Sequence, residues 1–515
     1  MTTTPSPDRI RPAVAGAAAA LAAIGLSELA SGVLSAQSLV AAIGGFVIDH
    51  QPAGAKDFVV GLFGTNDKVA LEVLIVATSL AIGAVLGIVA RRWSMVGSAG
   101  FALFAGLGFL AALSDPTTPA ATEAGVAAIA AFSGIYSLSW LLGPPSLPPR
   151  EGARTASMPD WSRRGFLLKS GALALGSIVA GFAGRRLVDL ARATPTTGGV
   201  TVPPPSAVAQ LPAGASLDVA GVTPIVMPNP NFYRIDTAII IPNVDPTTWS
   251  LRIHGLVDRE TTLSYAELVE LPLFEQYVTI ACVSNEVGGN LVGNAKWTGV
   301  RLRDVLEMAG VQASGTQLVG RSVDGWTAGM PTAWVMDPAR EPMIAVKMND
   351  ELLPRVHGFP ARLIVPGLYG YVSATKWLSE LELTTWEAFD GYWVPLGWSK
   401  NGPILTQSRI DVPGNGQSVP AGPVTLGGVA WAPDRGVSKV EVAIDGEWRE
   451  CRLSQPISNA TWVQWTYSWD ATAAGGEHTI EVRATDGKGE VQTPLVSTPA
   501  PDGARGHHTI RVRVG

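Results

Sequence analysis

Several residue types are scarce in this 515-residue chain, and each scarcity reduces the number of protein classes to which the chain could belong. Cys282 and Cys451 are its two cysteines and lie far apart, so a disulfide framework is not indicated and cysteine usage does not fix the compartment. Charged residues make up 16% of the chain, the net charge is −6, and no basic run occurs, which argues against nucleic acid as a partner. The mean hydropathy of +0.24 is high for a soluble protein and predicts a membrane portion.

Ligands for haem are also scarce in the first 200 residues. His50 is the one histidine there, and no C-x-x-C-H motif occurs. A haem held between helices usually needs paired axial ligands, so we expect no haem. Glu28 falls inside an apolar stretch, where a carboxylate is costly unless it faces other helices or water. Anchoring, or docking of a membrane partner, is therefore the expected role of this region.

Apolar residues are concentrated in residues 1–194, which we expect to form a membrane domain. A helix that crosses a bilayer needs about 20 apolar residues, and several Ala/Leu/Val/Ile/Gly-rich stretches have that length. They lie near 13–35, 69–90, 94–113, 119–142 and 166–184. The apolar run at 36–48 is shorter, which predicts an interfacial or re-entrant segment rather than a crossing.

Arginines flank these stretches unevenly, and this predicts their orientation. Arg9 and Arg11 precede the first stretch, Arg91 and Arg92 join the second to the third, and the next loop has no basic residue. Because positive side chains accumulate on the cytoplasmic side, five crossings place the N-terminus in the cytoplasm and the C-terminal region outside. Arg185, after the fifth stretch, opposes this orientation, and a crossing by the short run would change the parity.

The most informative cysteine lies in residues 277–306. A β-like run leads to Cys282 and a Gly/Asn-rich loop, after which we expect a turn at Trp297 into an amphipathic helix bearing Arg301 and Arg303. A thiol at the end of a buried strand, facing small polar residues, can serve as a soft thiolate ligand for a transition metal. The simpler interpretation is a buried apolar cysteine.

A second stretch, residues 348–383, places cationic residues beside tight loops. His357 follows a turn, Arg362 lies in a β-rich run, and Lys376 ends a Gly/Tyr-containing loop. Such groups beside tight loops favour binding of an anionic group such as a phosphate. The alternative is scattered surface charge.

Several motifs, in order along the chain, resemble the sulfite-oxidase-type molybdopterin oxidoreductases. They are NPNFYRIDTA from Asn229, ACVSN around Cys282, KWTGVRLRDVL, MNDELLPRVHGFPARLIVPG, SATKWL, and DGYWVPLGW near Tyr392, and they cover roughly residue 228 to the end. The resemblance implies one molybdenum–molybdopterin cofactor per chain, held by its dithiolene and by the Cys282 thiolate. It also implies two-electron oxo transfer with a small substrate.

The same resemblance implies a set of residues that line the cofactor. They are Phe232, Tyr233, Arg234, Ile235, Asp236, Cys282, Asp324, His357 and Arg362, with Ala374, Thr375 and Lys376 near the pterin phosphate. Tyr392 resembles the tyrosine that stands over the metal, although an extra Gly391 shifts that match. Sulfite oxidases carry two arginines shortly after the cysteine, whereas this chain has Glu286 there, which should disfavour doubly charged sulfite by repulsion. Arg234 would keep some affinity for anions, and we expect Cys282, Tyr392 and Arg234 to be the catalytic set.

Residues 162–169, SRRGFLLK, resemble a twin-arginine export signal followed by its apolar segment. The alternative is an ordinary positively charged flank, and the position after four apolar stretches departs from the usual N-terminal place. Export of a folded domain would suit a cofactor that is inserted in the cytoplasm. We therefore expect a multi-pass protein of the cell membrane with its catalytic domain on the extracytoplasmic side.

The organisation expected from these patterns is a multi-domain protein of transmembrane α-helices, an α+β domain and an all-β sandwich. Its regions are 1–194 (membrane), 195–225 (semi-extended Pro/Gly-rich linker, holding the next domain off the membrane), 226–402 (α+β, molybdopterin-binding) and 403–515 (immunoglobulin-like). Within the α+β domain we expect a strand at 249–257, with His254 structural, and a Ser-capped helix at 264–271.

The sandwich is expected to contain Cys451 as a structural residue and to use its tryptophans in its core and interfaces. In the family this domain commonly mediates dimerisation, so a homodimer is expected alongside a membrane or periplasmic electron-transfer partner. Two other functions stay open: a reductase of sulfoxide-type substrates fed by a membrane electron donor, and a catalytically inactive, membrane-anchored binding protein.

Overall fold

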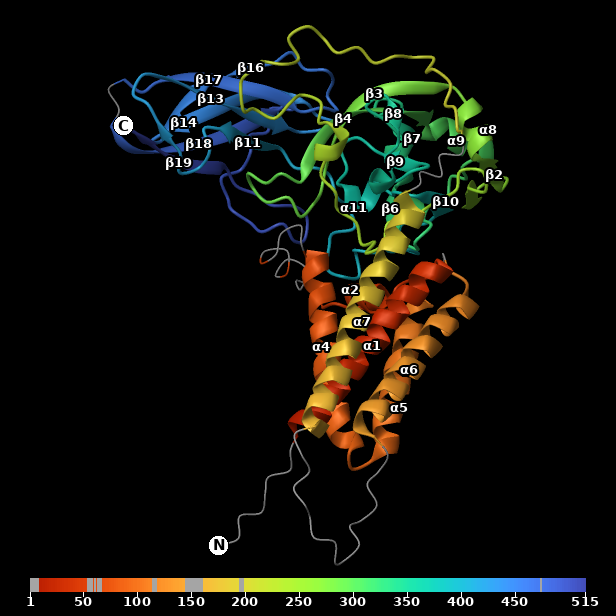
Figure 1. The fold of residues 1–515 in the computed structure, drawn as a ribbon. Helices are drawn as coiled ribbons and strands as arrows, with labels where there is room; N and C mark the ends of the chain where they lie inside the picture. The colour runs from red at the N-terminus through yellow and green to blue at the C-terminus, as the bar shows by residue number, and fades with distance from the viewer. Residues whose placement is uncertain are drawn as a thin grey trace, which may run out of the picture. The chain divides into compact units, whose positions relative to one another are not determined.

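The computed structural model describes residues 9–52, 59, 62, 67–113, 118–143, 161–193, 199–472 and 475–515. The chain divides into two units, which Figure 1 colours from red at the N-terminus to blue at the C-terminus. The first unit is Met1–Pro195 with Thr237–Ile240, and the second is Thr196–Asp236 with Ile241–Gly515.

The first unit is a bundle of α-helices (Figure 1). Its helices are α1 (Ile10–Leu34), α2 (Leu39–Asp49), α4 (Asp67–Ala90), α5 (Ser94–Ala112), α6 (Ala120–Leu142) and α7 (Trp161–Ala193). Within the described residues, five of them are long and apolar enough to cross a membrane, and α2 is the shorter one. These helices coincide with the apolar stretches predicted from the sequence, although α7 extends well beyond the predicted 166–184.

Glu28, in α1, has partners that account for a carboxylate in an apolar bundle. Its side chain accepts a hydrogen bond from Ser38 and lies 3.6 Å from the Arg185 guanidinium, which also contacts Glu72 at 2.8 Å. A carboxylate of this kind is tolerated in a membrane segment when it is paired. The same contacts give Arg185 two acidic neighbours, which weakens Arg185 as an orientation signal.

The second unit begins with an α+β region built on two sheets of its described residues. One has the order β2 (Thr261–Ser264), β1 (Ser250–Gly255), β10 (Leu378–Thr384), β5 (Gln317–Ser322), β6 (Thr327–Pro331). The other has the order β3 (Leu273–Ala281), β4 (Val292–Arg301), β7 (Met343–Met348), β8 (Glu351–Leu352), with β9 (Arg362–Ile364) pairing β7. The short helices are α8 (Tyr265–Glu270), α9 (Leu302–Ala309), α10 (Thr332–Val335) and α11 (Gly370–Ser373).

Local sequence explains several of these boundaries. Ser264 caps α8 through a capping box with Glu267, which confirms the predicted Ser-capped helix. Strand β1 matches the strand predicted at 249–257. The predicted turn at Trp297 is wrong, because Trp297 lies inside β4, fully buried and paired with Gln276 of β3. The amphipathic helix α9 starts at Leu302, five residues after Trp297, and Arg301 lies just before it.

Residues 199–225 contain no helix or strand, as expected of a linker, but they are bound to the second unit rather than free of it. Ser206 N donates to Leu273 O (2.8 Å), and Glu275 N donates to Ala207 O (2.8 Å), so this segment runs beside the start of β3. Further on, Leu217 N donates to the Gln464 side chain (2.7 Å). The expectation that this segment holds the domain at a distance is therefore not supported for its described part.

The C-terminal part of the second unit is the predicted sandwich. Its described residues form a sheet ordered β11 (Gln407–Val412), β13 (Pro423–Trp431), β17 (Val463–Asp470), β16 (Arg452–Leu453), and a sheet ordered β12 (Ser418–Val419), β19 (His508–Val514), β18 (Gly476–Asp486), β14 (Val437–Ile444), β15 (Glu447–Glu450). Fully or largely buried tryptophans and Cys451 fill the interior, as predicted. Burial raises the pKa of the Cys451 thiol to about 12, which makes it unreactive at neutral pH.

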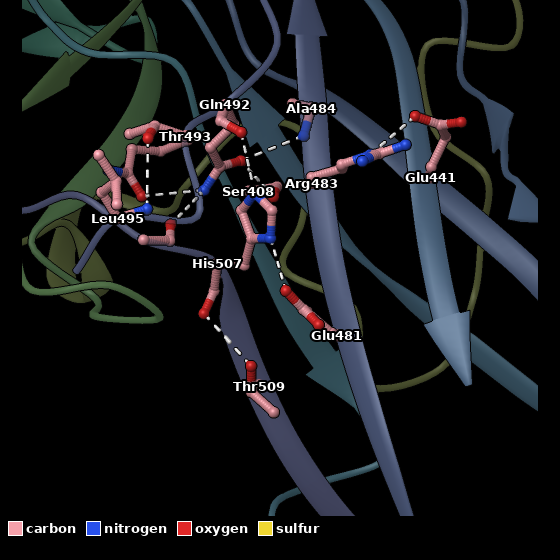
Figure 2. A network of polar contacts seen from close by, with 12 residues as sticks. Ser408, Glu441, Glu481, Arg483, Ala484, Gln492, Thr493, Leu495, His507 and Thr509 are labelled. Atoms are coloured by element: carbon pink, nitrogen blue, oxygen red, sulfur yellow. Dashed lines mark hydrogen bonds and ion pairs between the residues drawn. The ribbon is translucent and has the colours of Figure 1, made fainter. Parts of the chain in front are cut away.

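A polar network crosses this domain between strands and the chain segment before β19 (Figure 2). Gln492 accepts from Ser408 Oγ at 2.7 Å and from Ala484 N at 3.1 Å, and His507 Nδ1 lies 2.5 Å from Glu481. These contacts satisfy buried polar groups inside an all-β core. They tie the C-terminal segment 491–508 to the sandwich.

Candidate active site

Cys282 is the first residue after β3, as predicted, and a short closed loop fixes its backbone. Cys282 N donates to Leu291 O (2.9 Å), and its carbonyl oxygen accepts from Asn285 N (3.1 Å). The residue is 8% exposed, and the structure gives it no disulfide partner among the described residues. The sulfur is thus held at the end of a buried strand by hydrogen bonds on both sides of its own peptide units.

Two buried tyrosines from different segments, Tyr233 and Tyr369, have phenol pKa values that a negative charge on Cys282 would raise. Desolvation raises the pKa of the Tyr233 phenol well above its ordinary value, and the Cys282 charge raises it further while Arg362 lowers it. Burial likewise raises the pKa of Tyr369 to about 12, with a further contribution from Cys282. Tyr233 therefore lies within electrostatic range of both Cys282 and Arg362, and Tyr369 lies within electrostatic range of Cys282.

Beyond Tyr233 the structure gathers the predicted cationic residues. Arg362 Nη1 donates to His357 O at 3.1 Å, and His357 Nε2 donates to Asn229 O at 3.2 Å. Lys376 Nζ lies 2.8 Å from Asp236 Oδ2, and Arg234 pairs with the same carboxylate through Nε at 2.9 Å. Arg234 and Asp236 come from the NPNFYRID motif, whereas the other residues come from the second cationic stretch, so two sequence signals meet at one place.

In this cluster the positive charges outnumber the negative charges that could balance them. Desolvation lowers the pKa of Arg362 to about 10. Desolvation, together with repulsion from Arg362, lowers the pKa of Lys376 to about 8 and that of His357 to about 4. Lys376 and Arg234 share the Asp236 carboxylate, and Arg362 adds a further positive charge that lowers the pKa of Lys376, so an anionic ligand would relieve the repulsion.

A tight turn makes this closeness possible. Gly358 has φ +112°, and a Cβ there would lie 2.9 Å from Lys376 Cβ and 3.1 Å from Arg362 Cβ. A larger residue would separate the two cationic side chains and would be strained in this backbone conformation. The glycine of the HGFP motif is therefore needed for the close approach of the cationic side chains and not for the pairing of the sheet.

Other predicted cofactor residues surround the same cluster. Phe232 is buried, with its ring edge-on to His357 at 5.6 Å between centroids, and Ile235 follows in the same segment. Asp324 lies in the turn whose Val323 N donates to Trp377 O (2.9 Å), next to Lys376. Ala374 and Thr375 are buried beside it, and Thr375 O accepts from Leu363 N at 2.9 Å.

The residues of the site fit a molybdopterin group bound between the cysteine and the cations. Among the described residues, no cluster of three or more His, Cys, Asp or Glu side chains could hold a metal ion alone. A metal at Cys282 would therefore need the further sulfur ligands that a dithiolene supplies. Ser284 Oγ, two residues beyond the cysteine, is buried without a hydrogen-bond partner among the described residues, which leaves it available to a bound group.

Of two expectations about residues near the metal, the one for Glu286 changes with the structure and the one for Tyr392 stays a prediction. Glu286 is exposed to solvent, so the prediction that it repels substrate from within a desolvated pocket is wrong, because water screens an exposed charge. Tyr392 donates its backbone N–H to Thr327 O (3.2 Å), and its ring lies against Trp393. Its place over the metal remains a prediction.

The tyrosine that sequence reasoning missed is Tyr369, which is 4% exposed. Its hydroxyl accepts from Leu405 N at 3.4 Å and meets Gly503 of the C-terminal domain, where a Cβ would lie 2.6 Å from the oxygen. Arg505 and Asp502, paired at 2.9 Å, also act electrostatically on Tyr369. The sequence LYGY in a tight loop before the SATKWL motif was the available signal, but nothing in it indicates contact with a residue 87 positions earlier.

Comparison with known proteins agrees with this geometry. Residues 238–393 match the model of the oxidoreductase molybdopterin binding domain, and residues 407–482 match the bacterial Ig domain. Human mitochondrial sulfite oxidase is 30% identical over 318 residues, which cover 53% of this chain and 58% of the human protein. Residues 238–393 therefore belong to the family of oxidoreductase molybdopterin binding domains, and this part of the chain is similar to the sulfite oxidases.

Family membership confirms the cofactor class and the order of the two domains of the second unit. Another relative is nitrate reductase [NADH] 1 of Oryza sativa subsp. japonica, which is 28% identical over 309 residues, covering 48% of this chain and 34% of the rice protein. The chain thus spans little more than half the length of the sulfite oxidases it matches. Among solved structures, the sulfane dehydrogenase SoxCD of Paracoccus pantotrophus aligns with a TM-score of 0.48 at 22% identity, over 57% of this chain and 82% of that one.

Proposed function

We propose that the protein is a membrane-anchored molybdenum-cofactor oxidoreductase that catalyses two-electron oxo transfer on a small substrate outside the cytoplasm. The observation that carries this proposal is the cluster of Arg362, Lys376 and His357. The pKa values of all three are lowered, which indicates that a bound anion would stabilise the cluster. Tyr233 connects that cluster to the Cys282 sulfur. A thiolate at one end and a cationic site at the other suit a ligand that carries both a metal and a phosphate.

Each residue then has a separate task. Cys282 ligates the metal, Arg362 and Lys376 bind the phosphate, and His357, kept neutral by its low pKa, donates from Nε2 to the backbone and orients the NPN turn. The cofactor, when bound, supplies a centre that exchanges two electrons and an oxo group. Tyr369 is the polar group of this chain that we propose meets the substrate, and Arg234, which shares Asp236 with Lys376, belongs to the cofactor side.

The substrate we propose is a small oxygen-bearing or oxygen-accepting molecule such as an oxyanion or a sulfoxide. With Glu286 in solvent, the local charge beside Tyr369 comes from the Arg505–Asp502 pair, and Arg234 remains on the cofactor side. Oxidation in the manner of the sulfite oxidases is the first candidate. The nitrate reductase relative favours a second candidate, reduction of the substrate with electrons from a membrane donor.

The membrane helices support an anchored, multi-pass protein with its catalytic domain on the extracytoplasmic side. Arg9, Arg11, Arg91 and Arg92 lie at the ends expected to be cytoplasmic, and Arg185, the opposing signal, has Glu28 and Glu72 as counter-ions. Export through the twin-arginine-like segment, a homodimer through residues 403–515, and an electron-transfer partner in the membrane or periplasm complete this proposal.

Elemental and pterin analysis of the purified full chain tests the proposal. About one molybdenum and one molybdopterin per chain are expected; their absence from protein made in a host with ample cofactor would favour an inactive binding protein. Assays with oxidising and reducing dyes, run on sulfite, sulfoxides and nitrate, then decide the direction. Turnover with an oxidising dye supports the oxidase, and turnover with a reduced dye supports the reductase.

A further inference from the structure

The loop that carries Cys282 is closed by its own hydrogen bonds. Cys282 N donates to Leu291 O (2.9 Å), and Leu291 N donates to Asn285 Oδ1 (2.7 Å). Within it, Gly289 N donates to Glu286 O at 2.8 Å. Because these bonds leave the loop few ways to deform internally, a displacement at Gly289 is transmitted to the cysteine at its other end.

A buried arginine of the C-terminal domain holds this loop from outside. Arg409, in β11, is 8% exposed, and its Nη1 donates to Gly289 O at 2.8 Å. Its Nε donates to Asp411 Oδ1 (2.6 Å), and its Nη2 donates to Thr223 Oγ1 (2.7 Å). Asp411 also accepts from Thr223 N at 2.9 Å. The planar guanidinium is therefore fixed by three partners on three segments, a role that the point charge of a lysine cannot fill.

A second contact presses on the same loop beside that bond. His508, the first residue of β19, accepts from Ile410 N through Nδ1 at 3.0 Å. Its ring lies so close to Gly288 that a Cβ there would be 2.3 Å from the ring Cδ2. Gly288 has φ +76°, so a side chain there is strained as well as obstructed. Strands β11 and β19 thus contact consecutive residues of the cysteine loop, Gly289 through Arg409 and Gly288 through His508.

We propose that Arg409 is a positioning residue for Cys282, through which the immunoglobulin-like domain sets the place of the metal-ligating sulfur. The inference rests on the proposed function only in assuming that Cys282 ligates a metal. The contacts that position Cys282 are contacts within the chain and need no cofactor. The domain is then part of the metal site's scaffold rather than an appended module. Removing the guanidinium leaves Gly289 O and Asp411 with unsatisfied acceptors, and the loop gains freedom at the cysteine.

The reactivity of the Cys282 thiol measures this positioning without any cofactor. In a Cys451→Ala background Cys282 is the remaining cysteine, so the full chain, purified in detergent from a host that makes no molybdopterin, is alkylated with iodoacetamide there alone. Arg409→Met is expected to speed alkylation by about tenfold or more, since a buried charge-assisted contact is lost. Arg409→Lys should fall between Arg409→Met and the parent, because it restores the charge without the fork.

Matched variants separate positioning from damage to the fold. Arg483→Met removes an arginine of the same domain that pairs with Glu441 at 2.9 Å, in the network of Figure 2, and should leave the alkylation rate unchanged. Gly288→Ala acts from the loop side, because it removes no side chain of the sandwich, and should also speed alkylation. Melting curves identify any variant whose rate rises because the domain has unfolded, and Gly288→Ala then carries the test.

The cofactor-loaded chain gives the second readout, the thiolate-to-metal absorption band. We expect this band to shift in Arg409→Met and Gly288→Ala but not in Arg483→Met. Parent-like alkylation rates and an unshifted band in both loop variants would overturn the positioning role while leaving the proposed function standing. A parent chain that binds no molybdenum would instead remove the proposed function, and the alkylation rates would still decide whether Arg409 positions Cys282.

Discussion

Lys376 and Asp236 form an ion pair of 2.8 Å, although 140 residues separate them in the chain. The Asp236 side chain is 6% exposed and that of Lys376 is 11% exposed. The same carboxylate holds Arg234. One acidic residue therefore fastens the NPNFYRID segment to the SATKWL turn and is the counter-ion for both of their cations.

Replacing that carboxylate should be costly. Asp236→Asn leaves Lys376 buried without its counter-ion, so we expect the free energy of unfolding of the cofactor-free chain to fall by about 3–5 kcal/mol. Denaturant unfolding measures it. Glu260→Gln, which breaks the solvent-exposed pair with Arg252, is the control and should have little effect. Equal stabilities for the two variants would contradict the burial argument.

Acid should destabilise the cofactor-free chain through His357. The pKa of this imidazole is about 4 in the folded state against 6.5 for the free side chain, so between those values the unfolded chain binds more protons. The stability is therefore present above pH 6.5 and is lost as the pH falls towards 4, by up to about 3 kcal/mol. The pH dependence of the unfolding free energy measures this loss, and His357→Gln should flatten it. An unchanged curve would show that another group is responsible.

The two candidate tyrosines can be separated by removing their hydroxyls. Tyr369→Phe should lower kcat by about tenfold or more with the cofactor retained, because we propose that its hydroxyl, which is within electrostatic range of Cys282, meets the substrate. Tyr392→Phe should have the smaller effect if Tyr369 is the polar group at the substrate. Steady-state rates, normalised to molybdenum content, measure both. A large loss confined to Tyr392→Phe would restore the prediction made from the sequence.

The proposed orientation is tested by reporter fusions to the full chain. Alkaline phosphatase, which is active only outside the cytoplasm, should be active when fused after Gly515 and inactive when inserted after Arg92. The expected pattern follows from the arginines at the ends of the first helices. Activity at the Arg92 position, or inactivity at Gly515, would reverse the assigned sides or add a crossing at α2.

The features predicted from the sequence were those that depend on local pattern. Apolar length located the membrane helices, period-two alternation located the strand at 249–257, and the Ser cap at Ser264 located a helix start. The cofactor residues were predicted because the motif resemblance carries them; in the structure Lys376 pairs with Asp236, and Arg362 donates to His357 O.

What the sequence could not indicate depends on contacts between distant segments. Tyr369 lies within electrostatic range of Cys282, and Arg409 donates to Gly289 O, only because segments distant in the sequence fold together, and neither residue lies in a motif. Glu286 appeared important from its position after the cysteine, yet a one-dimensional pattern does not say which side of a loop faces solvent. Trp297 was predicted to mark a turn, but it lies inside strand β4 and its side chain is fully buried.

The central claim is that the Cys282 sulfur ligates molybdenum, and X-ray absorption at the molybdenum edge tests it most directly. The spectra of the wild-type chain, Cys282→Ala and the control Cys451→Ala are compared at matched molybdenum content. We predict that Cys282→Ala loses one sulfur neighbour of the metal and its turnover while remaining folded, and that Cys451→Ala matches the wild type. An unchanged sulfur shell in Cys282→Ala, or undiminished turnover, would contradict the account.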